Sequence, residues 1–255
     1  MRVFSHTCSN TEIVCALGAG DLLVGVDADS DFPPETVGPL PKPGRDLDLD
    51  VSAVLALQPD LVLTSLTVPG HERIVEELRA AGVPLRIIDP RSLEDVYASV
   101  QTIADALGIP ARGVALVGGM RAAMPAVAPR GRRPRLLVEW WPKPVIAPAR
   151  ESWVNELLWL AGAENPWASR DGKSIELADA DIFAAPPDAV VMSWCGVREE
   201  NYRADVVVRR AGWNALPAVR DGKIFPITEA FLGRPGPRLV EGYRAMRKII
   251  SQLET

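Results

Sequence analysis

An internal repeat is the feature that most limits how this chain can fold. The segment ALQPDLVLTS at residues 56–65 recurs as AAPPDAVVMS at 184–193, and EIVCALGAG at 12–20 recurs as ELLWLAGAE at 156–164. In the first of these pairs, both copies have a Pro-Asp turn that leads into an apolar run after a helical pattern. Repeats in the same order predict two similar α/β lobes, with a single larger sheet as the alternative.

Short apolar runs alternate with segments of helical period along the first half. We expect buried strands at 3–4, 22–26, 61–63 and 85–88, and helices at 11–17, 51–57, 72–81, 92–107 and 111–127. This alternation predicts βα units and a mostly parallel sheet. Ligands of open parallel sheets bind beyond the carboxyl ends of the strands, so we expect the loops after the strands to line a cleft between the lobes.

Charge and composition exclude several classes of function. The chain of 255 residues has a formal net charge of −5, which argues against binding a nucleic-acid backbone. No run approaches the ~20 apolar residues of a membrane span, so we expect no membrane insertion. The N-terminus lacks the pattern of a signal peptide, which predicts a cytoplasmic protein, or a periplasmic or cell-surface one if a leader has been removed.

The sequence offers no set of nucleophile, base and oxyanion hole, so we expect no catalytic residues and no enzyme. Three cysteines without a Cys-x-x-C pair argue against a thiolate zinc site, and we expect no bound metal. The two histidines, His6 and His71, are interpreted as polar loop residues or as ligand-site residues. The acidic run at 45–50 is interpreted as a solvated edge rather than a metal site, and the basic run at 130–135 as a linker or an anion site.

All seven tryptophans lie after residue 139. We expect Trp159 in the core and Trp213 as the anchor of a turn. The four that stand at strand ends or at the start of a helix are expected to line one wall of the cleft: Trp140, Trp141, Trp153 and Trp194. Because successive residues of a strand face opposite sides, only one of Trp140 and Trp141 is expected to face the ligand. Glu139 is expected to bond a polar edge of the ligand or a loop amide.

Several segments, in order, carry a resemblance to a known family: SNTEIVCALGAGDLLVGV, SDFPPE, LALQPDLVL, VEWWPKP, GWNALPAVRDGKIFPI and FLGRPGPRLVEG. Over almost its whole length the chain resembles the cobalamin-binding solute receptors of ABC importers, whose superfamily also binds siderophores, haem and metal chelates. The resemblance implies an α/β fold with two three-layer lobes and mostly parallel sheets, bridged by a long helix, as in class III periplasmic binding proteins. The implied divisions are a lobe at 1–107, a connecting helix at 108–130 and a lobe at 131–255.

The resemblance implies that the bound ligand is cobalamin (vitamin B12) or a related corrinoid, held for uptake, salvage or intracellular carriage. Phe32 stands where the family places an aromatic near the corrin, and Asp29 stands where members often have a tyrosine. Backbone groups, Ser65, Thr67 and Arg234 could bond the corrin amides. The expected ligand-binding residues are Ser9, Asn10, Asp29, Phe32, Ser65, Thr67, Glu139, Trp140, Trp141, Trp153, Trp194, Phe231 and Arg234.

Receptors of this family present one surface glutamate per lobe to the arginines of an ABC permease. The corresponding positions here are Ser52 and Gly233, with Asp50 and Glu229 nearby but offset. These departures argue against docking to an importer. An ABC permease is nevertheless kept as a candidate partner, because the family as a whole docks to one. The alternatives are a haem receptor with His6, His71 or a tyrosine as axial ligand, a siderophore receptor with an arginine-lined cleft, and a corrinoid-handling enzyme or chaperone.

Overall fold

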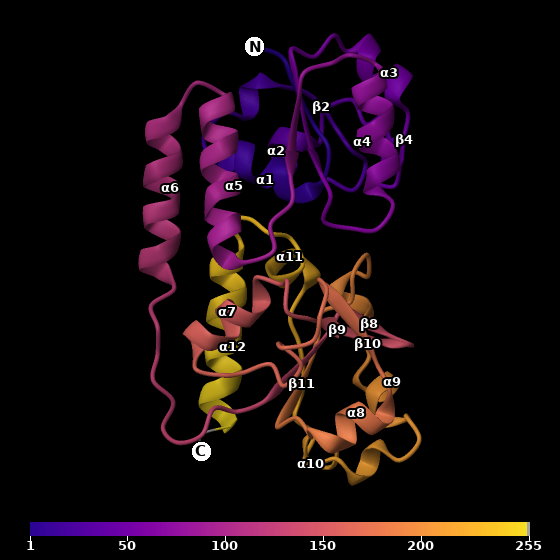
Figure 1. Ribbon diagram of the computed structural model, residues 1–255, viewed down its shortest axis with the longest axis vertical. Coiled ribbons are helices and arrows are strands. Elements are labelled where there is room, and N and C mark those ends of the chain that lie inside the picture. Colours follow the sequence, from indigo (N-terminus) through magenta and orange to yellow (C-terminus); the bar gives the residue numbers. More distant parts are fainter. Residues whose placement is uncertain (254–255) are drawn as a thin grey trace. The chain divides into compact units, whose positions relative to one another are not determined.

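In the computed structural model, residues 1–253 are described, and they form two compact α/β units (Figure 1). The first unit contains residues 1–90 and 94–120, and the second contains residues 91–93 and the chain from residue 121 onward. The expected pair of α/β lobes with parallel sheets is confirmed.

The first unit consists mainly of βα repeats. Its strands are β1 (Val3–Ser5), β2 (Leu23–Val26), β3 (Gly44–Arg45), β4 (Asp48–Leu49), β5 (Leu61–Ser65) and β6 (Leu85–Ile88). Its helices are α1 (Cys8–Ala16), α2 (Pro34–Val37), α3 (Val51–Ala56), α4 (His71–Ala80), α5 (Leu93–Ala106) and α6 (Pro110–Ala123), of which α5 and α6 extend slightly beyond the unit. The expected strands and helices therefore exist, with ends shifted by a few residues.

Four parallel strands form the sheet of the first unit in the order β2-β1-β5-β6. All residues of β1 and β5 are buried, as expected for the central strands of a parallel sheet covered on both faces. The acidic run at 45–50, expected as a solvated edge, lies largely within the short antiparallel hairpin β3–β4, and Arg45, Asp48 and Asp50 are exposed. Asp50 then begins α3, because its carboxylate accepts a hydrogen bond from the Ala53 N–H at 3.0 Å.

The second unit is less regular. Its strands are β7 (Leu136–Glu139), β8 (Trp141–Pro142), β9 (Val145–Pro148), β10 (Ser174–Leu177), β11 (Ala189–Met192) and β12 (Ile224–Pro226). Its helices are α7 (Val154–Ala161), α8 (Asp179–Ala184), α9 (Ala204–Val208), α10 (Pro217–Arg220), α11 (Glu229–Leu232) and α12 (Leu239–Leu253). A parallel sheet has the order β12-β11-β7, and a separate antiparallel sheet has the order β10-β9-β8. Sequence alternation did not predict the antiparallel sheet, because its strands are short and rich in turn residues.

The repeat is visible in the bonding of two aspartates. Asp60, just before β5, accepts the N–H of Arg2 at 2.7 Å, and its own N–H donates to the Arg2 carbonyl at 2.8 Å. Asp188, just before β11, makes the same two bonds with Arg135, at 2.7 and 2.8 Å. The Pro-Asp pair found in both halves of the sequence therefore aligns each strand with its neighbour β1 or β7.

Two tryptophans test the expectations about packing. Trp213 is fully buried and donates its indole N–H to Asp179 at 2.8 Å, in agreement with an anchoring role. Trp159 was expected in the core, but 56% of it is exposed. The expectation was wrong because α7 turns this position outward, where the Arg133 guanidinium stacks 3.4 Å from the ring centroid.

Candidate functional site

In the first unit, a tight turn connects β1 to α1 at the carboxyl end of the sheet. Thr7 occupies this turn with a φ of 83°, a conformation that costs a β-branched residue about 1–3 kcal/mol. The Thr7 N–H donates to Asp27 at 2.9 Å, and the hydroxyl lies 3.1 Å from that of Ser65. The surrounding polar groups thus hold a strained backbone at the end of the strand where ligands of such sheets bind.

Asp27 is the organising residue of the loop after β2. It is fully buried, and its carboxylate accepts hydrogen bonds from the N–H groups of Thr7, Asp29 and Ser30 and from the Ser30 hydroxyl, over 2.7–3.1 Å. Burial raises the pKa of this carboxyl, while its hydrogen bonds oppose the shift. This arrangement fixes Asp29, whose carboxylate pairs with Arg45 at 2.9 Å and accepts the Asp46 N–H at 3.1 Å.

Three expected ligand residues of the first unit belong to a buried polar network. Ser9, Asn10 and Ser65 are at most 4% exposed. The Asn10 amide donates to the His6 carbonyl at 2.9 Å and to the Ser65 hydroxyl at 3.1 Å, and the Thr7 and Ser9 hydroxyls lie 3.3 Å apart. The side chains of Ser9, Asn10 and Ser65 are therefore bonded to the β1–α1 turn and stabilise its conformation. Phe32 is 42% exposed and Thr67 is half-buried, so these two remain accessible.

The two histidines lie together instead of in exposed loops. His6 is fully buried, with Nδ1 2.8 Å from the Thr64 hydroxyl and Nε2 2.7 Å from the Asp46 carbonyl oxygen. His71, at the start of α4, is 1% exposed; its ring centroid lies 5.1 Å from that of His6, and its Nε2 lies 3.6 Å from an Asp46 carboxylate oxygen. Burial, aided by His71, lowers the pKa of His6 to about 4, so this imidazole is neutral at physiological pH.

In the second unit, Glu139 ends β7 and is fully buried. Its carboxylate accepts hydrogen bonds from the two terminal guanidinium nitrogens of Arg210, Nη1 and Nη2, the latter at 3.1 Å. It also accepts the indole N–H of Trp194 at 3.2 Å. Burial raises the pKa of this carboxyl, and Arg210 and Trp194 oppose the shift. Glu139 and Trp194, both expected at the ligand, are therefore bonded to each other, and Trp194 is only 4% exposed.

The two remaining tryptophans of this segment lie where β7 leads into the hairpin β8–β9. Trp140 is half-buried; its N–H donates to the Ile146 carbonyl at 2.7 Å, and its carbonyl accepts the Cys195 N–H at 3.0 Å. Trp141 is 42% exposed, and its indole N–H donates to the Lys143 carbonyl at 3.1 Å. The backbone of Trp140 is thus fixed on both sides while aromatic surface of both residues stays accessible.

The loop after β11 is tied to α11. The Tyr202 hydroxyl donates to the Trp194 carbonyl and accepts the Glu229 N–H, both at 3.2 Å, and the Gly196 N–H donates to the Glu229 carboxylate at 3.2 Å. Cys195 is exposed. The surrounding protein atoms and the Glu229 carboxylate raise the pKa of its thiol to about 12. No sequence pattern predicted Tyr202 and Glu229 as supports of this loop.

Trp153 and Arg234 also have partners within the second unit. Trp153 is 8% exposed and donates its indole N–H to the Leu232 carbonyl at 2.8 Å, which attaches the start of α7 to α11. Arg234 pairs with Glu229 at 3.2 Å, and its side chain is 12% exposed. Phe231 is half-buried, with the Arg238 guanidinium 4.9 Å from its ring centroid. Of these residues, Phe231 keeps the most accessible apolar surface.

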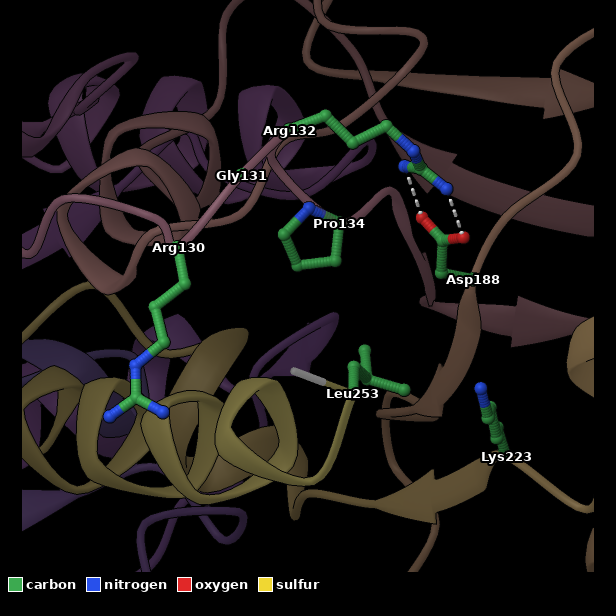
Figure 2. A pocket seen from close by; sticks show the side chains of 7 residues that line it. All are labelled: Arg130, Gly131, Arg132, Pro134, Asp188, Lys223 and Leu253. Carbon is green, nitrogen blue, oxygen red and sulfur yellow. Dashed lines mark hydrogen bonds and ion pairs between the residues drawn. The ribbon is translucent and has the colours of Figure 1, made fainter. Parts of the chain in front are cut away.

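The basic run at 130–135 lines a separate cavity of about 250 Å³ near the amino ends of β7, β11 and β12 (Figure 2). Arg132 forms a two-pronged ion pair with Asp188 at 2.6 and 2.7 Å, which Figure 2 shows as two dashed lines. Arg130, Lys223 and the last residue of α12, Leu253, complete the lining. Cations near a helix C-terminus offset the negative end of its dipole, so this cluster has a structural explanation.

The described residues lack two features, a cluster of metal-binding side chains and a helix that could span a membrane. Residues 1–253 contain no group of three or more His, Cys, Asp or Glu side chains placed to hold a metal ion. The same part of the chain has no helix with both the length and the apolar character needed to cross a bilayer. Both histidines and all three tyrosines of the chain lie within these residues, and each is at most 7% exposed.

A sequence profile described as "Periplasmic binding protein" matches residues 3–230. The chain belongs to the periplasmic binding protein family. Members of this family bind solutes without transforming them, which agrees with the absence of a recognisable catalytic set in the sequence. No comparison supports the expected cytoplasmic location, because the description of the family itself names the periplasm.

Similar proteins within this family differ in their ligands. An uncharacterised ABC transporter substrate-binding lipoprotein, YvrC of Bacillus subtilis, is 29% identical over 98% of this chain and 79% of its own length. A vitamin B12-binding protein of Vibrio parahaemolyticus is 26% identical over 93% of this chain and 84% of its own. The solved structure of the periplasmic heme-binding protein RhuT from Roseiflexus sp. RS-1 superimposes with a TM-score of 0.82 at 28% identity, covering 100% of this chain and 99% of that one.

Proposed function

We propose that this protein is the substrate-binding component of an ABC importer and that its ligand is cobalamin or a related corrinoid, bound without chemical change. The observation that carries the choice of ligand is the burial of every histidine and tyrosine of the chain. A corrinoid brings its cobalt already held by the corrin ring and needs no protein ligand on the metal. A protein that binds haem commonly supplies an axial histidine or tyrosine, and neither is accessible here.

Other potential metal ligands do not change this conclusion. The exposed thiol of Cys195 has a pKa of about 12, so at neutral pH it is protonated and a poor ligand for iron. The His6 imidazole uses both nitrogens within the first unit. Haem binding would require one of the buried histidine or tyrosine side chains to become accessible.

Charge argues against an anionic siderophore. Three arginines of the expected ligand loops or their supports are each paired with a carboxylate: Arg45 with Asp29, Arg210 with Glu139 and Arg234 with Glu229. Their positive charge is therefore already balanced before any ligand arrives. A ligand rich in neutral amides fits these loops better than one that carries several negative charges.

The proposed contact surface is aromatic. Phe32 and Trp141 are each 42% exposed, and Trp140 and Phe231 are half-buried. We assign Phe32, Phe231 and one of the two tryptophans Trp140 and Trp141 to the faces of the corrin, and Thr67 and Asp29 to its amide rim. The other expected ligand residues have polar groups bonded within their own unit, so we assign them to the support of the contacting loops: Ser9, Asn10, Ser65, Glu139, Trp153, Trp194 and Arg234. An indole face that covers ~100 Å² of ligand contributes about 2–3 kcal/mol.

A pair of matched substitutions tests this assignment. We expect Trp140→Ala to weaken binding of cyanocobalamin by about 1–3 kcal/mol, measured by isothermal titration calorimetry. Trp159→Ala is the control, because Trp159 is 56% exposed but lies on α7 away from the strand ends. Equal affinities of the wild type and Trp140→Ala, with both proteins folded by circular dichroism, would remove Trp140 from the site.

The importer partner is tested separately. The positions expected to carry docking glutamates are Ser52 and Gly233, whereas Asp50 caps α3 and Glu229 bonds Arg234 and Gly196. If docking uses the offset acids, Asp50→Asn should weaken capture by a cobalamin-type permease at low salt, because Asp50 is exposed while Glu229 is already engaged. Capture that is indifferent to Asp50→Asn would exclude Asp50 as a contact.

A further inference from the structure

We propose that His6 and His71 form an acid-sensitive clasp that holds the hairpin β3–β4 on the carboxyl end of the first unit's sheet. Both histidines of the chain contact the same hairpin residue, Asp46, one through its backbone carbonyl and the other facing its carboxylate. No structural role in a packed apolar core requires two buried imidazoles against one acid. The arrangement points to a hairpin whose attachment depends on the protonation of a histidine.

The hydrogen bonds define the state of His6 when the clasp is closed. Nε2 lies 2.7 Å from a carbonyl oxygen, which can only accept, so Nε2 carries the proton and donates it. Nδ1 then accepts from the Thr64 hydroxyl at 2.8 Å. A second proton on His6 would make Nδ1 a donor as well. The Thr64 hydroxyl would have to turn away, and a buried cation would face the His71 ring without a carboxylate in contact.

Neighbouring groups act on the pKa of His6 in both directions: burial and the facing His71 lower it, while the hydrogen bond to the Asp46 carbonyl and the Asp46 carboxylate oppose the shift. The facing imidazole of His71 holds the pKa of Asp46 below its ordinary value, so Asp46 stays ionised as His6 titrates. Four elements contribute groups that face the cluster. The hairpin contributes Asp46 and Arg45, and α4 contributes His71 and Arg73. The loop after β2 contributes Asp27 and Asp29, and β5 contributes the uncharged Thr64. Of these, the Arg73 side chain reaches the Leu47 carbonyl at 2.8 Å and reinforces the closed hairpin at any pH.

The clasp also reaches the loop after β2. The Asp46 N–H donates to the Asp29 carboxylate at 3.1 Å, Arg45 pairs with the same carboxylate, and the Ala28 N–H donates to the Gly44 carbonyl at 2.7 Å. Release of Asp46 therefore loosens the loop that carries Asp29 and leads to Phe32. The clasp itself needs no ligand; its effect on ligand release rests on the proposed function.

The direction of the pH dependence follows from the lowered pKa of His6. An open hairpin exposes His6 with an ordinary pKa near 6.5, whereas the closed one holds it near 4. The open form therefore binds the proton more tightly, and closure is fully favoured above pH 6.5 and is lost progressively as the pH falls toward 4. Between pH 7 and pH 5 the ratio of open to closed hairpin should rise roughly 20-fold.

Hydrogen exchange on the ligand-free full chain tests the clasp. The reporters are three N–H groups: those of Ala28 and Asp46, which bond between the loop after β2 and the hairpin, and that of Asp50, which bonds the Pro43 carbonyl at the base of the hairpin. The control is the Leu66 N–H, which bonds the Ile88 carbonyl in the same unit. After correction for the intrinsic exchange rate, we expect the opening constant of the reporters to rise about 20-fold from pH 7 to pH 5 while that of the control stays constant.

A variant and a spectroscopic measurement keep the test decisive. His6→Gln retains a donor for the Asp46 carbonyl but does not titrate, so the reporters should lose their pH dependence. If this variant does not fold, nuclear magnetic resonance of the wild type replaces it: His6 should show the Nε2–H tautomer and titrate near pH 4. Reporter exchange that does not respond to pH, or a His6 that titrates near 6.5, would overturn the clasp.

The effect of the clasp on ligand release is measured separately. If both proposals hold, the dissociation rate of cyanocobalamin rises between pH 7 and 5 in the wild type and not in His6→Gln. A pH-dependent hairpin without cyanocobalamin binding would retain the clasp and reject the proposed ligand. A pH-independent hairpin with tight cyanocobalamin binding would do the reverse.

Discussion

Removal of the Arg210 side chain by Arg210→Met should destabilise the second unit strongly. Arg210 donates to both oxygens of the fully buried Glu139 and, at 2.9 Å, to the Pro142 carbonyl. Its guanidinium also lies 4.3 Å from the ring centroid of Trp213. This one side chain therefore joins the end of β7, the start of the β8–β9 hairpin and a buried tryptophan.

The magnitude follows from what Arg210→Met leaves behind. Loss of one partner of a buried ion pair costs about 3–5 kcal/mol, because the other charge stays buried and unpaired. Glu139 keeps the Trp194 indole N–H at 3.2 Å, and the methionine chain retains part of the packing. We therefore expect a loss near the lower end, about 3 kcal/mol, in the free energy of unfolding.

Tryptophan fluorescence during urea unfolding measures this loss selectively. All seven tryptophans lie in the second unit, so their emission reports on that unit alone. Arg209→Met is the matched control: Arg209 is the preceding residue, its side chain is 81% exposed, and it pairs with the exposed Asp205 at 3.1 Å. An exposed pair of this kind contributes about 0.3–0.5 kcal/mol.

The pH dependence of the loss in the free energy of unfolding provides a second test. Burial already raises the pKa of Glu139 while Arg210 opposes the shift, so the pKa rises further in Arg210→Met. The folded variant then binds a proton more tightly than the unfolded chain, and the deficit relative to wild type should be largest at neutral pH and shrink as the pH falls. A loss no greater than that of Arg209→Met, or one that is constant with pH, would refute the reasoning.

Two further predictions concern single residues of the second unit. Alkylation of Cys195 by iodoacetamide, followed by peptide mass spectrometry, should be slow at pH 8 and rise about tenfold per pH unit without a plateau below pH 10, because its thiol pKa is about 12; a plateau near pH 9 would contradict this. Asp188→Ala should cost about 1–2 kcal/mol in urea unfolding, and Asp60→Ala less, since Asp188 bonds Arg132 as well as the Arg135 N–H. Although burial opposes the shift, these bonds hold the pKa of Asp188 below its ordinary value, so its contribution is present at neutral pH and lost on acidification; equal losses for both variants would be inconsistent with the geometry.

The parallel strands and the longer helices of the first unit could be predicted from the sequence. Apolar runs such as 61–63 are read directly because a strand buried on both faces needs apolar residues at every position. The Pro-Asp pairs at Asp60 and Asp188 predicted the repeat, and their identical backbone bonds explain why both halves keep this dipeptide. The β8–β9–β10 sheet was missed because strands of two to four residues are too short to show a clear alternating pattern.

The side chains of the expected site were harder to predict than their positions. Trp153 and Trp194 follow the pattern of exposed strand-end residues, but each indole N–H finds a partner within the second unit. Those partners, the Leu232 carbonyl and Glu139, are 79 and 55 residues away in sequence, and no local pattern encodes such a contact. The same holds for His6 and His71, which are 65 residues apart in sequence yet lie with their ring centroids 5.1 Å apart beside Asp46 of the hairpin.

Parallel calorimetric titrations of the wild-type protein with cyanocobalamin, cobinamide and hemin test the central claim most directly. The account predicts tight binding of cyanocobalamin or cobinamide, with no saturable binding of hemin and no shift of its Soret band. Tight hemin binding with a shifted Soret band, and no heat with either corrinoid, would contradict it, because one of the buried histidines or tyrosines would then have to reach the iron.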